Sequence, residues 1–123
     1  MKNILSILVV LTFILISATA FAGEGPMQLP EDSNPEASMH NKEGIKHWGM
    51  GHYDEALKHF KEASAIDGSS GEIHFNEAIS YDKLGQHGVA TKHFGVAKKK
   101  AGGNQKILKS PILNGHLWSG FSF

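Results

Sequence analysis

The sequence contains no cysteine, and this absence removes several classes of function. Disulfide frameworks, thiolate metal sites, covalent haem attachment and cysteine nucleophiles are all excluded. Arginine is absent too, so all 12 basic residues are lysines, and planar two-point recognition of phosphate or carboxylate is disfavoured. The 12 acidic residues balance the lysines, which gives no electrostatic reason to expect nucleic acid or an anionic membrane as a partner.

Long apolar runs are scarce, and the clearest one lies at the start of the chain. It extends from Ile4 to Ile16 behind Lys2, and small residues follow it up to an Ala-x-Ala sequence that ends at Ala22. At about 13 residues it is short of the roughly 20 that span a bilayer. We therefore predict a secretory signal peptide over residues 1–22, cleaved after Ala22, and a periplasmic or secreted protein with no membrane span after cleavage.

Proline is also rare, and three of the 4 prolines lie between residues 23 and 36, among glycines and acidic residues. This stretch has no apolar periodicity, and its composition opposes both helices and strands. We predict a flexible linker over residues 23–36, acting either as a spacer or as a docking strip.

From residue 37 the sequence repeats itself. Residues 37–70 and 71–104 align without gaps, and their shared positions are His40/His74, Glu43/Glu77, Ile45/Ile79, Gly51/Gly85, Ala56/Ala90, Lys58/Lys92, His59/His93, Phe60/Phe94, Ala63/Ala97 and Gly68/Gly102. A period of this length indicates stacked supersecondary units. Apolar residues spaced three and four apart, with a glycine break in each unit, predict two helices per unit: 38–50 and 53–67, then 72–84 and 88–100.

These units resemble the tetratricopeptide repeat family. The first contains Gly44, His47, Ala56 and Phe60 at the family's spacing, and the second contains Ala78, Tyr81, Ala90 and Phe94. The resemblance implies an all-α fold, with two helix–turn–helix repeats in a right-handed α-solenoid. It departs from the family pattern where His and Glu replace the usual Trp and Leu, and where Gly68 and Gly102 replace the closing proline.

Two repeats leave an exposed face that needs a cover. Residues 105–123 offer a capping helix and an aromatic tail, although Pro111 interrupts the helical pattern and predicts either a short helix or two fragments. A second copy of the chain is the alternative cover, which would make a homo-oligomer.

The family binds peptides or proteins in a concave groove lined by the first helix of each repeat. By that resemblance, the partner-binding residues here are Asn41, Ile45, Trp48, Phe75, Ile79, Asp82 and Lys83. We expect Trp48 and Phe75 to be exposed, with Trp48 as the main anchor, or else as packing against the linker. The predicted function is a non-enzymatic scaffold that binds another protein or peptide. No catalytic set and no cofactor motif is visible.

The 8 histidines suggest an alternative, which is a metal-binding periplasmic protein. His40, Glu43 and His47 share one helical face, and His74 and Glu77 repeat this arrangement one unit later. Imidazole and carboxylate groups at such spacing can bind zinc, nickel, copper or iron. They can equally form histidine–glutamate hydrogen bonds, since a duplicated repeat explains the matching positions without any ligand.

Overall fold

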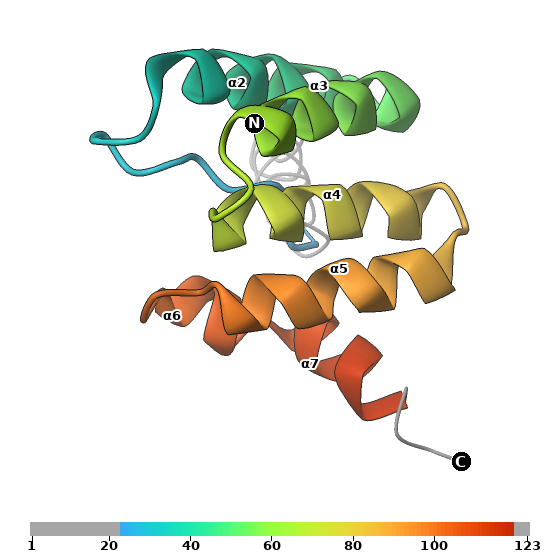
Figure 1. Cartoon of the computed structure of the whole chain (residues 1–123). Helices are drawn as coiled ribbons and strands as arrows, with labels where there is room; N and C mark the ends of the chain where they lie inside the picture. Colours follow the sequence, from blue (N-terminus) through green and yellow to red (C-terminus); the bar gives the residue numbers. More distant parts are fainter. Residues whose placement is uncertain (1–22, 120–123) are drawn as a thin grey trace, which may run out of the picture.

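A computed structural model describes residues 23–119, and all regular secondary structure in that range is helical. The predicted signal peptide and residues 120–123 of the aromatic tail lie outside the described residues. The helices, with labels as in Figure 1, are α2 (Pro35–Gly49), α3 (Tyr53–Ile66), α4 (Gly71–Lys83), α5 (His87–Lys99), α6 (Gln105–Leu108) and α7 (Pro111–Ser119). None of them is long and apolar enough to cross a membrane.

The helices pack in adjacent pairs. Helix α2 packs on α3 and α4 packs on α5, while contacts between α3 and α4 join the two pairs. Figure 1 shows the pairs stacked in chain order, with α7 against α5 at the end of the stack. Helix α4 is therefore an internal helix with neighbours on two sides, whereas α2 has only α3 as a helical neighbour of comparable extent.

Helix boundaries follow the local signals closely. Asn34 caps α2, because its side chain accepts hydrogen bonds from Glu36 N and Ala37 N, and Ser70 caps α4 in the same way through Ile73 N. The turns inside the two pairs use Gly51 and Gly85, whose φ angles of 76° and 79° favour glycine. These turns separate α2 from α3 and α4 from α5 at equivalent positions of the repeat.

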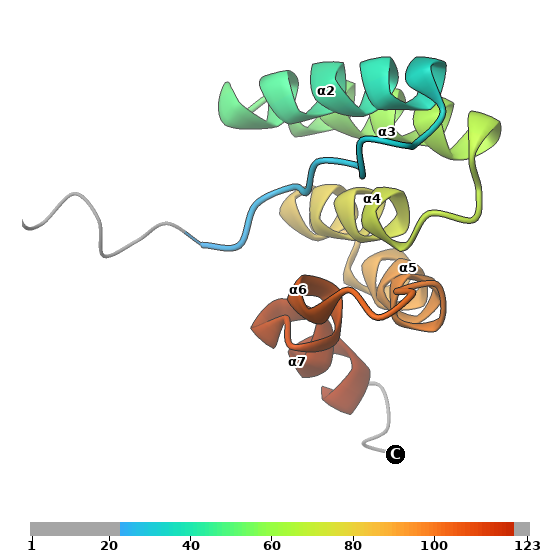
Figure 2. The same ribbon diagram turned by 90° about the vertical axis from the view of Figure 1, so that its left-hand side faces the viewer.

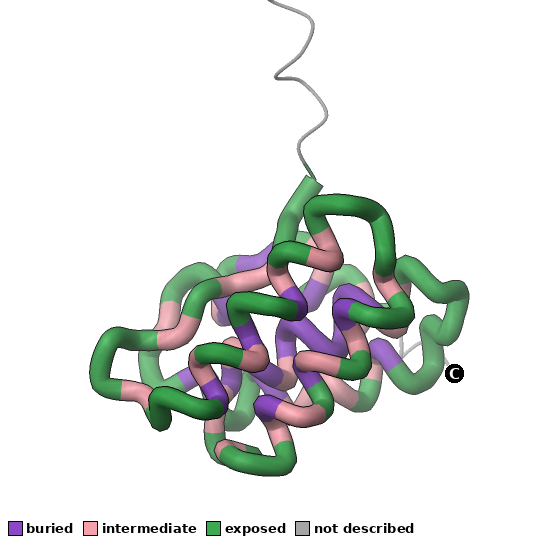
Figure 3. The backbone as a smooth tube through the Cα atoms, turned by 90° about the horizontal axis from the view of Figure 1, so that it is seen from above, coloured by how far each residue is buried: buried purple, intermediate pink, exposed green. Residues whose placement is uncertain are grey.

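The core lies along the middle of the stack, where Figure 3 shows the buried backbone positions. Alanines at 56, 63, 90 and 97 bring helices close together, and Phe60 and Phe94 fill the remaining space. Gly44 is needed for this packing, because a Cβ atom at that position would lie 2.5 Å from Phe60 Cε1. The alanines and phenylalanines that are identical in the two repeats are therefore the residues that fill the core of each helix pair.

Two short helices cover the second pair. Pro111 is the first residue of α7 rather than an interruption within a longer helix, so the chain breaks between α6 and α7. Ile107 and Leu113 are fully buried and join the same apolar cluster as Phe75 and Phe94. Of the two forms predicted for this region, the structure has two fragments.

The residues between 23 and 34 form no helix, yet they follow a defined path over the stack. Figure 2 shows this segment running beside α2 and α4 before it enters α2. We name residues 24–30 the strap. Instead of hanging free as the sequence suggests, the strap contacts residues 41 and 76 on the first helices of the two pairs, and Met27 packs against the core.

Candidate functional site

Part of the surface predicted to bind a partner is buried in the structure. Asn41 and Phe75 have no exposed surface, and Ile79 is 1% exposed. The expectation that Phe75 is an exposed aromatic is therefore wrong. Its ring packs edge-on against Phe94, with a centroid separation of 5.7 Å, and lies in one cluster with Met27 and Ile107.

Two buried asparagines hold the strap by its backbone. Asn76 Oδ1 accepts a hydrogen bond of 2.7 Å from Met27 N, and Asn76 Nδ2 donates one of 2.8 Å to Met27 O. Asn41 Nδ2 donates to the same carbonyl at 2.9 Å, and Asn41 Oδ1 accepts a hydrogen bond of 2.8 Å from Asn76 Nδ2. The pair thus binds both polar backbone groups of one extended residue.

The other predicted groove residues are spread over the surface. Ile45 and Trp48 are half-buried, and Trp48 packs against the core with its ring edge-on to Tyr53 at 4.8 Å. Trp48 also lies beside Gly25 of the strap, which agrees with packing against the linker. Lys83 is exposed, with its ammonium 5.7 Å from the Tyr53 ring centre.

An open groove follows one side of the strap. It has a volume of about 810 Å³ and lies between the strap, the start of α4 and the region of α6. Its wall carries Phe75, Asn104, Lys106 and Lys109, and the strap itself contributes the opposite side. The groove therefore leaves room for further chain next to the strap.

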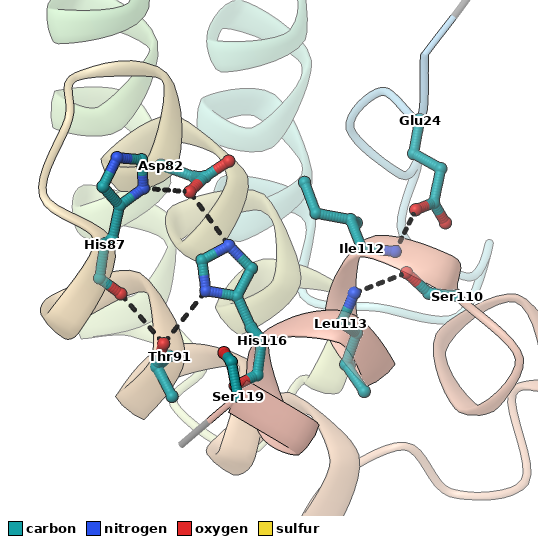
Figure 4. A network of polar contacts seen from close by, with 9 residues as sticks. All are labelled: Glu24, Asp82, His87, Thr91, Ser110, Ile112, Leu113, His116 and Ser119. Atoms are coloured by element: carbon teal, nitrogen blue, oxygen red, sulfur yellow. Dashed lines mark hydrogen bonds and ion pairs between the residues drawn. The ribbon is translucent and has the colours of Figure 1, made fainter. Parts of the chain in front are cut away.

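The strap also reaches the C-terminal cap. Glu24 Oε2 accepts a hydrogen bond of 2.8 Å from Ile112 N, so the Glu24 carboxylate caps the start of α7 together with Ser110 (Figure 4). A carboxylate is favourable at a helix N-terminus, where backbone N–H groups are unpaired. The strap thus links the first helix pair to the last helix.

Asp82, predicted as a groove residue, instead joins the cap. Its Oδ1 lies 2.6 Å from His87 Nδ1 and 2.9 Å from His116 Nε2, and the other His116 nitrogen lies 2.9 Å from Thr91 Oγ1 (Figure 4). This network attaches α7 to α4 and α5. His87 Nδ1 and both nitrogens of His116 have polar partners. We therefore interpret the network as a structural contact that holds the cap in place.

The remaining histidines form two clusters, one in each helix pair. In the first cluster His40 Nδ1 and His59 Nδ1 lie 2.9 and 3.3 Å from Glu62 Oε2. His47 stacks on His59 with a centroid separation of 5.4 Å. Glu43 is exposed and does not join these histidines, so the predicted set of His40, Glu43 and His47 is not assembled as one site.

The second cluster contains the predicted pair His74 and Glu77, together with His93 from α5. Glu77 Oε2 lies 3.3 Å from His74 Nδ1 and 2.8 Å from His93 Nδ1. Glu77 is 3% exposed, which makes it the most deeply buried acidic side chain in the described part of the chain. His74 Nε2 is hydrogen-bonded to Gly68 O at 2.9 Å, which fixes the orientation of the ring.

These contacts change the protonation of the second cluster. The short contact with the Glu77 carboxylate raises the pKa of His74, against burial, which lowers it; the Gly68 carbonyl raises it further. Burial by itself raises the pKa of Glu77, but the contacts with His74 and His93 together outweigh it and hold the pKa below its ordinary value. Without another ligand, the cluster favours an ion pair.

Three residues of these sites, Met27, Asn76 and His93, were not among the site residues predicted from the sequence. Met27 is one of two large apolar residues, with Leu29, in a segment rich in proline and glycine, and Asn76 lies between Phe75 and Glu77 on a helix of mixed polarity. Met27 could have been noticed as an apolar residue in the linker, whereas nothing in the sequence distinguishes Asn76 from the other polar residues of its helix. His93 matches His59 in the repeat, but its distance from Glu77 depends on how α4 and α5 pack.

Comparison with known proteins adds no family to this description. A scan against protein-family models finds no match for the chain, and a search of curated proteins finds no similar sequence.

Proposed function

We propose that the protein is a small non-enzymatic scaffold of the tetratricopeptide type, a right-handed solenoid of two repeats with a cap. Its signal peptide directs export and is cleaved after Ala22, and the mature protein, periplasmic or secreted, binds an extended segment of another protein. One observation carries the proposal: Asn41 and Asn76, from the first helices of the two repeats, hydrogen-bond the backbone N–H and C=O of Met27.

This contact defines what kind of partner fits. Hydrogen bonds to backbone groups recognise an extended chain of any sequence, while side-chain pockets select among sequences. Here the residue between the asparagines packs an apolar side chain into the cluster around Phe75. The expected partner is therefore an extended segment with methionine or a similar apolar residue at that position.

The strap is the competitor that such a partner has to displace. A tethered segment acts at an effective concentration on the order of mM, so the free protein binds a partner weakly unless the strap is loosened. Outside the asparagine pair, Glu24 caps α7, Gly25 lies beside Trp48, and the Met27 side chain packs against the core. Loosening the strap at Met27 should therefore expose the groove without disturbing the helix pairs.

A labelled synthetic peptide tests this directly. The probe has the sequence of residues 23–33, and its binding to the purified protein is followed by fluorescence anisotropy. We expect weak binding to the wild type, tighter binding to Met27→Gly, and loss of binding to the double variant Met27→Gly/Asn76→Ala. The matched control, Met27→Gly/Asn114→Ala, removes an asparagine from the exposed side of α7 and should bind like Met27→Gly.

Two results would contradict the proposal. One is that Met27→Gly binds the peptide no better than the wild type. The other is equal binding by the Asn76 and Asn114 double variants, which would place the peptide outside the asparagine pair. Export is tested separately, since N-terminal sequencing of protein recovered from the cell envelope or medium should begin at Gly23.

A further inference from the structure

We propose that His74, Glu77 and His93 bind a divalent transition-metal ion, with Zn²⁺ as the reference ion. The proposal concerns the second helix pair and is independent of peptide binding. The two residues on α4 are one turn apart, and the third comes from the facing helix α5. All three ligand atoms lie within 4.8 Å of one another.

The spacing of the ligand atoms matches a metal-centred arrangement. Metal–nitrogen and metal–oxygen bonds of about 2.0–2.2 Å in a tetrahedron place neighbouring ligand atoms about 3.4 Å apart. The separation of His74 Nδ1 and Glu77 Oε2 is 3.3 Å, and that of His93 Nδ1 and Glu77 Oε2 is 2.8 Å. The first distance already fits, and the second needs an opening of about half an ångström, which a small rotation of the His93 ring supplies.

The three atoms also lack other partners. His74 Nδ1, His93 Nδ1 and Glu77 Oε2 are buried and form no aligned hydrogen bond, despite the short distances between them. Among the described residues, their only polar neighbours are one another, at 2.8 and 3.3 Å. A cation placed between them would satisfy all three at once.

The surroundings hold His74 and His93 as ligands. Gly68 O can only accept, so His74 Nε2 carries a proton, and an ion that displaces the proton from Nδ1 meets a lone pair directed at the site. A backbone carbonyl on the second nitrogen is the usual support of a metal-binding histidine. The His93 ring is held between neighbours, since it stacks on Tyr81 at 5.2 Å and on His74 at 5.8 Å.

The related clusters are weaker candidates. In the first helix pair the carboxylate is that of Glu62, whose side chain is 40% exposed, compared with 4% for Glu77. The cluster around Asp82 includes His87, which is 69% exposed, and both nitrogens of His116 already have hydrogen-bond partners. Only the second-pair cluster combines a buried carboxylate with unpaired ligand atoms among the described residues.

The ligand set selects the class of ion. Two imidazoles and one carboxylate suit Zn²⁺, Ni²⁺, Cu²⁺ and Fe²⁺, whereas Mg²⁺ and Ca²⁺ prefer oxygen ligands alone. Three protein ligands leave a fourth position for water or for a group from a partner molecule. The most exposed of the three side chains is His93, at 27%.

The repeat supplies an internal control for the test. His59 occupies the same position in the first repeat as His93 in the second. Purified full-length protein is freed of metal with a chelator and titrated with Zn²⁺ by calorimetry, and with Co²⁺ by visible absorption. We expect one tight site, with ligand-field bands for Co²⁺, in the wild type and in His59→Ala. His93→Ala and Glu77→Gln should each weaken Zn²⁺ binding by about 100-fold or more, because loss of a ligand exceeds the usual effect of losing a ligand's support.

The outcomes separate clearly. Absence of a tetrahedral or five-coordinate Co²⁺ spectrum from the folded wild type overturns the proposal without any variant. Binding that survives His93→Ala and is lost in His59→Ala assigns the ion to the first pair and also overturns it. Circular dichroism of each variant establishes that a loss of binding comes from a folded protein. If His93→Ala does not fold, Glu77→Gln, which keeps the side-chain shape, decides.

Discussion

Replacing Asn76 by alanine should release the strap from the helix pairs. The Asn76 side chain makes three hydrogen bonds: it accepts one from Met27 N and donates to Met27 O and to Asn41 Oδ1. Alanine removes all three and leaves Met27 N–H and Asn41 Oδ1 without a partner. Met27 O keeps its bond from Asn41 Nδ2, so the strap retains one of its contacts here.

The size of the effect follows from these contacts. At about 1 kcal/mol for each neutral hydrogen bond, the loss is about 3 kcal/mol. Two unpaired buried groups would cost about 1–3 kcal/mol each if they stayed dry, but release of the strap hydrates both and limits the total. For a domain of about 100 residues, 3 kcal/mol lowers the melting temperature by roughly 10–20 °C.

Hydrogen exchange and urea unfolding measure the two parts of this prediction. Exchange of the Met27 amide should accelerate by about 100-fold, because each 1.4 kcal/mol corresponds to a factor of ten. Urea unfolding should report a free energy of unfolding that is about 3 kcal/mol lower. Asn114→Ala serves as the control, because this asparagine makes one exposed hydrogen bond, to Leu108 O.

The reasoning is refuted if the Met27 amide of Asn76→Ala exchanges as slowly as in the wild type. Faster exchange of the Met27 amide with an unchanged free energy of unfolding would contradict only the estimated magnitude. It would show that the strap is held at Asn76 but contributes nothing to the folded state, and the estimate of 3 kcal/mol would be wrong.

Three further predictions concern packing and charge. Gly71→Ala should lower the free energy of unfolding by about 1–3 kcal/mol in urea, because its Cβ would lie 2.6 Å from the backbone oxygen of Lys100; unchanged stability would mean that α4 and α5 separate easily. Gly115→Ala should raise it by up to about 1 kcal/mol, because the new methyl meets no atom within 4 Å and alanine favours helix; a loss would show an unrecognised contact. With metal removed by a chelator, the stabilisation that protonated His74 gives the folded state should be present at low pH and lost as the pH rises through its raised folded pKa. The stabilisation from ionised Glu77 should be lost as the pH falls through its lowered folded pKa. The melting temperature measured across pH should therefore be raised most between these two pKa values, and Glu77→Gln should reduce this dependence on pH.

The helices themselves could be predicted because their signals are local. Gly51 and Gly85 end the first helix of each pair, and the structure differs from the expected boundaries there by one residue. The start of α2 is earlier than expected, at Pro35 rather than 38, because Asn34 caps it and proline is tolerated in the first turn. The pattern of the linker could not reveal the strap, since its ordering depends on side chains 14 and 49 residues away.

The candidate sites show the limit of reasoning from a repeat. Glu43 and Glu77 are equivalent in sequence, yet the first is exposed and the second is buried. In the second repeat Glu77 contacts His74 and His93, whereas in the first repeat the equivalent His40 and His59 contact Glu62 instead, and the second repeat has Val96 at that position. The spacing of His74 and Glu77 on one helix was readable from the sequence. The approach of His93 was not, because it depends on the distance and angle between two helices.

The strap also has a consequence for how the chain folds. Stacked helical units normally contact only their neighbours, so such arrays can fold and unfold piecewise. Here Glu24 bonds Ile112 across 88 residues, and Met27 bonds Asn76 across 49. Contacts of this sequence separation slow folding and tie the ends of the array into one cooperative unit. The strap is synthesised before the helices it joins, so its docking is expected to be a late step, completed only when α7 has formed.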